Sequence, residues 1–205
     1  MRFFSKEKQD EFAYHLIGEK GTFLDMGCYH PCDGNNTQAL ELIGWTGILV
    51  DIRPRWVNMC KMMRKSPVFC VDVTKNSFTE LLRENTETMV FDYVSIDTDE
   101  GSVGGLEQFL KNGFSFKCLT YEHDSYECGD SRKAPAMKIL KEYGYFPIFE
   151  DVLTDGTDKP TLEAWEDWWI NPKVFPSELL EIKKTNCYYG DCIKSLVDFK
   201  KKGLI

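Results

Sequence analysis

Three motifs that identify common enzyme classes are missing from this chain of 205 residues. It has no G-x-G-x-x-G, which disfavours a glycine turn that cradles the pyrophosphate of a dinucleotide. It has no Tyr-x-x-x-Lys pair, which further disfavours a nicotinamide-dependent dehydrogenase. It also has no C-x-x-C pair. This agrees with free, mostly buried thiols rather than disulfides for its eight cysteines, as expected of a cytosolic protein.

Long apolar segments and an excess of positive charge are absent as well. No run approaches the length needed to cross a bilayer, and residues 1–7 lack the apolar core of a signal peptide. We therefore expect a cytoplasmic protein without a membrane partner. The formal net charge of −8 repels phosphate backbones, so nucleic acid is not expected as a partner either.

The stretch from residue 21 to residue 52 predicts a strand, a tight turn, a helix and a second strand. The turn falls at Gly27, which can adopt a positive φ and lets a ligand approach the backbone closely. The second strand ends at Asp51. Because ligands of open α/β sheets bind outside the carboxyl ends of the strands, we expect Asp25, Gly27 and Asp51 to surround one crevice.

The residues of this crevice favour a nucleoside without phosphates. A carboxylate such as Asp51 can accept hydrogen bonds from both ribose hydroxyls, and it repels a 2′-phosphate. The single glycine of the turn is followed by Cys28, Tyr29, His30 and Pro31, which make a poor cradle for a diphosphate. The sequence therefore favours S-adenosylmethionine as the cofactor.

Acids recur at the ends of the first four predicted strands, at Asp25, Asp51, Asp72 and Asp97. The later strands are predicted at 67–71, 89–96 and 116–121, followed by a hairpin of 145–149 and 163–170 with a turn at 155–160. Helices are predicted over 6–18, 54–64, 79–84, 103–111 and 132–143. The order of elements indicates an α/β sandwich with its acids gathered at one edge of the sheet.

Several short motifs, taken in order along the chain, support this interpretation. They are D-x-G-C at 25–28, Y-H-P at 29–31, N-T at 36–37, G-W-x-G-I at 44–48, Asp51, Pro54, S-I-D at 95–97, Y-E-H at 121–123, G-Y at 144–145 and E-D-W-W at 166–169. Over residues 20–170, their order and spacing resemble the FkbM-type methyltransferases, which use S-adenosylmethionine on a Rossmann-like, class I methyltransferase fold. The chain departs from the family between Asp97 and Gly105, where its loop is longer and richer in glycine.

The resemblance implies a mostly parallel seven-stranded sheet with a C-terminal antiparallel hairpin and helices on both faces. Residues 1–172 would form this methyltransferase domain, including the N-terminal helix. Residues 173–205 would form a helical extension that packs on the same domain and could support a homodimer. The resemblance also implies O-methylation of a sugar hydroxyl or glycosylated product, with a small molecule or glycan as acceptor.

The expected site residues follow from the strand ends and the shared motifs. The cofactor-binding candidates are Asp25, Gly27, Cys28, Tyr29, Asn36, Thr37, Asp51, Ile52, Asp72, Val73 and Asp97. A sugar hydroxyl is a weak nucleophile at neutral pH and needs a base, for which the candidates are His123, Asp97, Glu122 and His30. Two alternatives remain open, since His123 could form a structural ion pair with neighbouring acids and His30 could order the Gly27 loop.

A hard divalent cation is compatible with the sequence but is not required by it. Asp97, Asp99, Glu122 and Asp124 could supply oxygen ligands for magnesium, or they could be solvated carboxylates. Two other functions also stay open. The longer Asp97–Gly105 loop is compatible with a methyltransferase-like binding or assembly subunit that has lost catalysis, and a nucleotide-dependent oxidoreductase is less favoured for the reasons given above.

Overall fold

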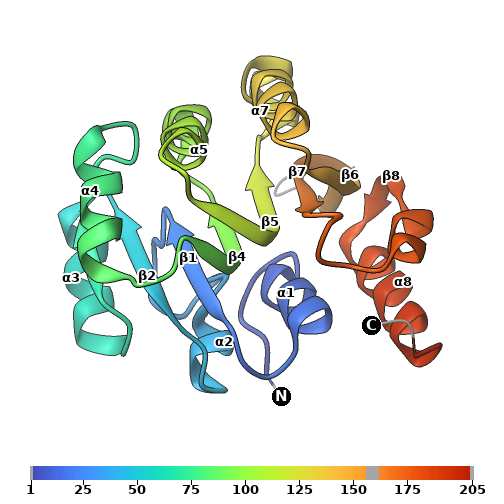
Figure 1. The fold of residues 1–205 in the computed structure, drawn as a ribbon, viewed down its shortest axis with the longest axis horizontal. Coiled ribbons are helices and arrows are strands. Elements are labelled where there is room, and N and C mark those ends of the chain that lie inside the picture. Colours follow the sequence, from blue (N-terminus) through green and yellow to red (C-terminus); the bar gives the residue numbers. More distant parts are fainter. Residues whose placement is uncertain (1, 156–161, 204–205) are drawn as a thin grey trace.

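A computed structural model of the chain describes residues 2–155 and 162–203, and it contains one sheet of eight strands (Figure 1). The strands are β1 (Thr22–Met26), β2 (Thr46–Asp51), β3 (Val68–Cys70), β4 (Val90–Ile96), β5 (Ser115–Glu122), β6 (Phe146–Asp155), β7 (Leu162–Ile170) and β8 (Lys184–Tyr188). Their order across the sheet is β3-β2-β1-β4-β5-β7-β6-β8. All run in the same direction except β7, which is antiparallel to both of its neighbours.

Helices cover both faces of this sheet. They are α1 (Gln9–Ile17), α2 (Gln38–Leu42), α3 (Pro54–Met63), α4 (Asn76–Asn85), α5 (Ser102–Lys111), α6 (Ser125–Cys128), α7 (Asp130–Glu142) and α8 (Tyr189–Lys201), with 3-10 turns η1 (Asp99–Gly101) and η2 (Ser177–Ile182). Buried side chains of α1, α2, α3 and α8 pack in one apolar cluster, and those of α4, α5 and α7 pack in another. None of the helices in the described parts of the chain is long and apolar enough to span a bilayer.

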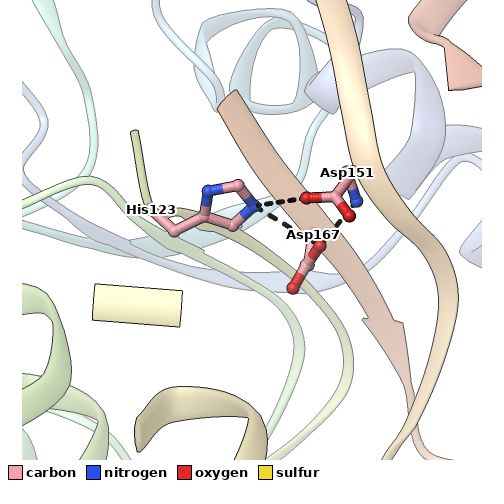
Figure 2. Close-up of side chains that lie close together, drawn as sticks. All are labelled: His123, Asp151 and Asp167. Carbon is pink, nitrogen blue, oxygen red and sulfur yellow. Dashed lines mark hydrogen bonds and ion pairs between the residues drawn. The ribbon is translucent and has the colours of Figure 1, made fainter. Parts of the chain in front are cut away.

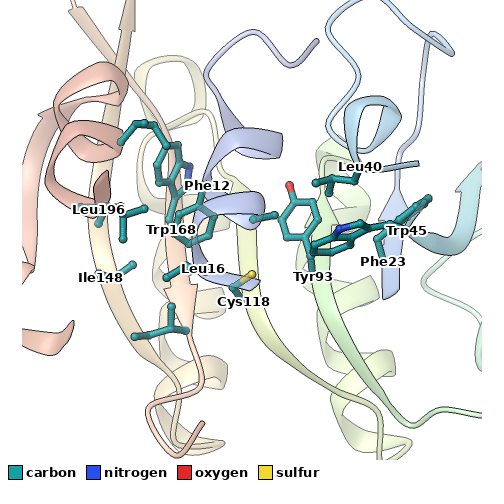
Figure 3. Packing of buried hydrophobic residues seen from close by; sticks show 14 of the residues in the cluster. Phe12, Leu16, Phe23, Leu40, Trp45, Tyr93, Cys118, Ile148, Trp168 and Leu196 are labelled. Atoms are coloured by element: carbon teal, nitrogen blue, oxygen red, sulfur yellow. The ribbon is translucent and has the colours of Figure 1, made fainter. Parts of the chain in front are cut away.

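The two clusters lie on opposite faces because successive side chains of a strand point to opposite sides. In β7, Trp168 belongs to the first cluster and its neighbour Trp169 to the second. Figure 3 shows the first cluster, in which Trp168 meets Phe12 of α1 with ring centroids 4.7 Å apart. These two tryptophans therefore hold the hairpin to the sheet core.

The parallel register brings the carboxyl ends of the central strands to one level. Met26 of β1 pairs with Val50 of β2 on one side and with Ile96 of β4 on the other. The strand order reverses direction between β1 and β4, since β2 and β3 lie on one side and β5 on the other. Such a switch point is where open α/β sheets bind their ligands.

The predicted fold class is confirmed, but the sheet has one strand more than predicted. Residues 184–188 form β8 along β6, between a 3-10 turn and α8, where the sequence predicted helices alone. The segment K-T-N-C-Y is polar and largely exposed, so it carries no apolar alternation that would indicate a strand. The predicted turn at 155–160 falls almost entirely outside the described residues.

Close contact between β1 and β2 makes a specific stability prediction. A Cβ added at Gly47 would collide with the ring and the carbonyl oxygen of Phe23. We expect Gly47→Ala to lower the free energy of unfolding by about 1–3 kcal/mol, because this contact is buried and cannot relax freely. Urea denaturation would measure the loss. Gly101→Ala is the matched control, since its Cβ would come no closer than 3.4 Å to Thr98, and equal losses in both variants would contradict the explanation.

Candidate functional site

A cavity of about 380 Å³ opens over the carboxyl ends of the parallel strands. Six residues that the sequence nominated for cofactor binding line it: Gly27, Asp51, Ile52, Asp72, Val73 and Asp97. The loop that departs from the family pattern contributes Thr98 through Gly101 to its wall. The unusual loop is therefore part of this cavity, where η1 shapes the chain before α5 begins.

A second cavity, of about 200 Å³, adjoins the first and shares Gly27 and Asp97 with it. It is lined by further predicted residues, namely Asp25, Cys28, Tyr29, His30, Asn36 and Glu122. Trp165 of β7 also lines it, whereas the other two tryptophans of this strand, Trp168 and Trp169, are buried in the core. The predicted site residues thus divide between two adjacent spaces rather than surrounding one crevice.

Gly27 lies between the two cavities and is held by backbone contacts. It has a φ of +87°, and a Cβ there would collide with the carbonyl oxygen of Asp97. The N–H groups of Gly27 and Cys28 both donate to the carbonyl oxygen of Val50, at 2.9 and 3.1 Å. Because these two donors are already engaged, the turn is a poor seat for a diphosphate, in agreement with the sequence.

Asp51 stands at the cavity with both carboxylate oxygens engaged. Oδ2 accepts the N–H of Tyr29 at 3.0 Å, and Oδ1 accepts the N–H of Arg53 at 2.8 Å. The Arg53 side chain also reaches Asp51, with Nε 3.1 Å from Oδ1. Backbone groups therefore orient a carboxylate that is only 2% exposed, and the Arg53 side chain covers it from outside. Arg53 was not predicted as a site residue.

Asp72 and the residues beside it form another part of the first cavity. Asp72 accepts hydrogen bonds from the N–H and the hydroxyl of Thr74, at 2.9 and 2.7 Å. These bonds lower the pKa of Asp72, so the group stays ionised. Its other oxygen lies 4.0 Å from Lys75, an exposed side chain. Ile52, which precedes Arg53, is a largely exposed apolar residue at the cavity mouth.

Beneath the second cavity, Asp25 belongs to a buried polar network. It accepts a hydrogen bond from the Thr37 hydroxyl at 2.7 Å, and burial raises its pKa. Arg64 of the α3 end donates to Thr37 at 3.0 Å and to Asn35 at 2.9 Å, and it also pairs with Glu41. Thr37 is fully buried and reaches Asp25 rather than open space, so it supports the site from behind.

The loop after β1 is ordered by its own side chains. His30 Nδ1 accepts the N–H groups of Cys32 and Asp33, at 3.3 and 2.9 Å. Of the two interpretations of His30, this geometry supports the one in which it orders the loop. Tyr29, with a φ of +44°, packs against Trp56 in a tilted arrangement with ring centroids 4.2 Å apart.

Two side chains of the second cavity reach across to other elements. Asn36 donates to the hydroxyl of Ser95 in β4 at 2.9 Å, which ties the loop after β1 to the neighbouring strand. Cys28 is buried with its sulfur 3.8 Å from that of Cys60 in α3. Burial of both thiols, with no disulfide between them, agrees with the prediction of free cysteines.

Asp97 and Glu122 form a carboxyl pair in the second cavity. Burial raises the pKa of Asp97 to about 6, and burial together with the charge of Asp97 raises the pKa of Glu122 well above its ordinary value. Two neighbouring carboxyl groups do not ionise easily together, so one of the two keeps its proton over a wider pH range. One carboxylate of the pair is thus available as an acceptor of a second proton.

His123 lies elsewhere than its predicted role requires. It is fully buried, and its ring is directed at Asp151 and Asp167 of the hairpin (Figure 2). It lines neither cavity. The neighbouring acid Asp124 pairs with Arg132 at 2.6 Å. The expectation that His123 acts as the base is therefore corrected, because its ring does not reach the cavity that Glu122 lines. Consecutive residues at a strand end point to opposite sides, and Glu122 takes the side of the cavity.

The four acids considered for a magnesium ion do not assemble. Asp97 and Glu122 line the second cavity. Asp124 forms an ion pair with Arg132. Asp99 is exposed and has a positive φ in η1. Within residues 2–155 and 162–203, the cluster with ligand atoms close enough for one ion is His123, Asp151 and Asp167.

Comparison with known proteins shows the fold of the chain. No family model and no curated protein matches the sequence, so the FkbM resemblance stays an interpretation. Among solved structures, a candidate rRNA methylase from Clostridium thermocellum is 11% identical and has a TM-score of 0.55, with 83% of this chain and 97% of that one covered. A DUF574 family protein from Streptomyces avermitilis is 13% identical at a TM-score of 0.54, with 82% of each chain covered.

An O-methyltransferase from Bacillus cereus in complex with SAH is 13% identical at a TM-score of 0.51, and 80% of each chain is covered. At these sequence identities the similarity shows a common backbone fold and does not show a common reaction. It shows that this chain has the Rossmann-like, class I methyltransferase fold.

Proposed function

We propose that this chain is a methyltransferase that uses S-adenosylmethionine. The observation that carries the proposal is the cavity over the carboxyl ends of β1 to β4, where Asp51, Asp72 and Gly27 come together on a methyltransferase fold. The cofactor supplies a methyl group on a sulfonium, which an aligned nucleophile displaces in line. A residue set rich in carboxylates and poor in free N–H donors suits a cationic, phosphate-free nucleoside.

Residues of the first cavity would divide the binding of the nucleoside between them. Asp51 would accept hydrogen bonds from the ribose hydroxyls after the Arg53 side chain swings outward, which is feasible because that side chain is 48% exposed. Asp72 would accept a hydrogen bond from the adenine amino group. Ile52 and Val73 supply the apolar contacts that an aromatic base prefers.

The acceptor would enter the second cavity, where carboxyl and amide side chains predominate. Asp97, Glu122 and Asn36 offer several hydrogen-bond acceptors to a molecule rich in hydroxyl groups, which favours a sugar or glycosylated acceptor. The resemblance to the FkbM-type enzymes supports the same substrate class. We assign Asp97 as the base, because its carboxylate can take the hydroxyl proton as the new C–O bond forms.

One observation favours a second candidate function, a binding subunit without catalysis. The Arg53 guanidinium forms an ion pair with Asp51, the carboxylate that the ribose would need. In a binding subunit this ion pair would not open. Binding of the cofactor separates the two functions, since a permanent ion pair would keep the ribose away from Asp51.

The first prediction concerns Asp51. Asp51→Ala is expected to weaken binding of S-adenosylmethionine by about tenfold or more, because a hydrogen bond to a charged group is lost. Isothermal titration calorimetry measures the change, and the same titration with NAD should show no binding. Arg53→Ala is the matched control: it frees the same carboxylate and should not weaken binding. Unchanged affinity in Asp51→Ala would remove this residue from the proposed site.

The second prediction concerns the proton on Asp97 and can be tested without a methyl acceptor. The pKa of Asp97 is raised to about 6 in the folded protein by burial, against 3.8 for the ordinary group. Between these two pH values the folded state binds the proton more tightly than the unfolded state. The free energy of unfolding therefore decreases as pH rises from about 4 to about 6, by about 1–3 kcal/mol for this group.

Urea denaturation at several pH values tests this prediction. Asp97→Asn should remove that part of the pH dependence, whereas Asp92→Asn, at a half-buried position in β4, the strand that ends just before Asp97, should leave it in place. An identical pH dependence in Asp97→Asn and the unaltered protein would contradict the assignment.

A further inference from the structure

Three strands bring His123, Asp151 and Asp167 together outside the two cavities (Figure 2). His123 follows β5, Asp151 lies in β6, and Asp167 lies in β7. Nε2 of His123 is 3.4 Å from Oδ1 of Asp167 and 3.9 Å from Oδ1 of Asp151. One ligand atom from each residue lies within 4.8 Å of the other two, so the three could contact a common centre.

The imidazole of His123 presents a nitrogen without a hydrogen-bond partner. The residue is 0% exposed, and Nε2 is buried and unpaired among the described residues while it points between the two carboxylates. Its other nitrogen, Nδ1, accepts the Ser125 N–H at 3.2 Å and lies 2.8 Å from the Ser125 hydroxyl. These contacts fix the ring. An ion at Nε2 requires the ring proton on Nδ1, where the Ser125 hydroxyl would accept it, as a partner of a metal-binding histidine does.

The carboxylates are positioned by the backbone of the hairpin. Oδ1 of Asp167 accepts the N–H of Asp151 at 2.7 Å. Asp151 has a φ of +51° and falls in an irregular part of the pairing of β6 with β7. Such irregularities redirect a side chain relative to a regular strand. The main chain of His123 is fixed as well, since its N–H donates to the carbonyl oxygen of Trp165 at 2.8 Å.

The charges of the cluster call for a further positive group. Lys133 of α7 lies 2.5 Å from Oδ1 of Asp151 and balances one of the two carboxylates. Asp167 is 2% exposed, and its ion-pair partner among the described residues is His123. A buried carboxylate without a cation is costly, so a cation beside Asp167 would stabilise this part of the hairpin.

We propose that His123, Asp151 and Asp167 form a binding site for a divalent first-row transition-metal ion such as zinc. Two ligand atoms about 2.1 Å from a tetrahedral zinc ion lie about 3.4 Å apart, so the His123–Asp167 distance fits and Asp151 needs only a small shift. One imidazole nitrogen with carboxylate oxygens suits zinc, iron or cobalt better than magnesium, which prefers oxygen ligands alone.

The proposed ion would join the end of β5 to the β6–β7 hairpin, one residue from Glu122. Its role is to position that edge of the second cavity, and it takes no part in the reaction. The inference does not depend on methyl transfer, because it rests on a separate cluster and is tested by metal binding alone.

Lys133 would compete with the ion for Asp151, and this competition distinguishes a metal site from an ion-pair cluster. The ammonium group must leave Oδ1 when a metal ion binds there, because the two cations would repel each other across one carboxylate oxygen. Lys133→Met should therefore tighten metal binding. A merely structural ion-pair cluster would gain no metal affinity from the same change.

The experiment is a titration of the chelator-treated protein with Co²⁺, followed by visible absorption and by displacement with Zn²⁺. We expect one ion per chain with nitrogen and oxygen ligation, at least about tenfold weaker binding in Asp151→Asn and in His123→Gln, and several-fold tighter binding in Lys133→Met. Circular dichroism and urea denaturation without metal would establish that each variant is folded. Asp124→Asn, an acid next to His123 that pairs with Arg132, is the matched control and should bind as the unaltered protein does.

Three results would overturn the proposal. They are the absence of saturable binding of one ion, an affinity unchanged in both Asp151→Asn and Lys133→Met, and a sulfur-to-cobalt charge-transfer band, which would assign the ion to the cysteines.

Discussion

The backbone contact between Gly27 and Asp97 determines how the functional edge of this sheet is divided. The carbonyl group of Asp97 fills the space that a side chain at position 27 would need, so the ends of β1 and β4 lie against each other. The N–H of Asp97 donates to the carbonyl oxygen of Met26 at 2.9 Å, which closes the same contact from the other strand. Two adjacent cavities result, and these two residues are common to both.

A buried arginine supports one side of this arrangement. Arg64 is fully buried, and it connects Glu41 of α2 with Asn35 and Thr37 of the loop after β1. Glu41 in turn accepts the N–H groups of Lys65 and Ser66, so both ends of the ion pair carry additional hydrogen bonds. A buried ion pair is tolerated when its remaining polar atoms are satisfied in this way. The loop beside the second cavity is therefore stiffened from within by groups that contact no ligand.

The sequence predicted those features that depend on local patterns. Acids that follow apolar strands locate the binding edge, since parallel strands must end at the same level, and Asp51, Asp72 and Asp97 are found there. Contacts between distant segments were not predictable in this way. The engagement of Asp51 by Arg53, the role of Arg64 and the partners of His123 depend on three-dimensional proximity. The polar strand β8 was missed because its pairing with β6, rather than its own residues, holds it in place.

The extra strand has a consequence for self-association. It covers β6, which would otherwise be the last strand of the sheet, and places the largely exposed segment Lys184–Asn186 at the boundary. Asn186 has a φ of +53°, so the new margin is not a regular extended template. A charged, short and kinked border discourages continuous pairing between the sheets of two molecules, and hence aggregation through strand addition.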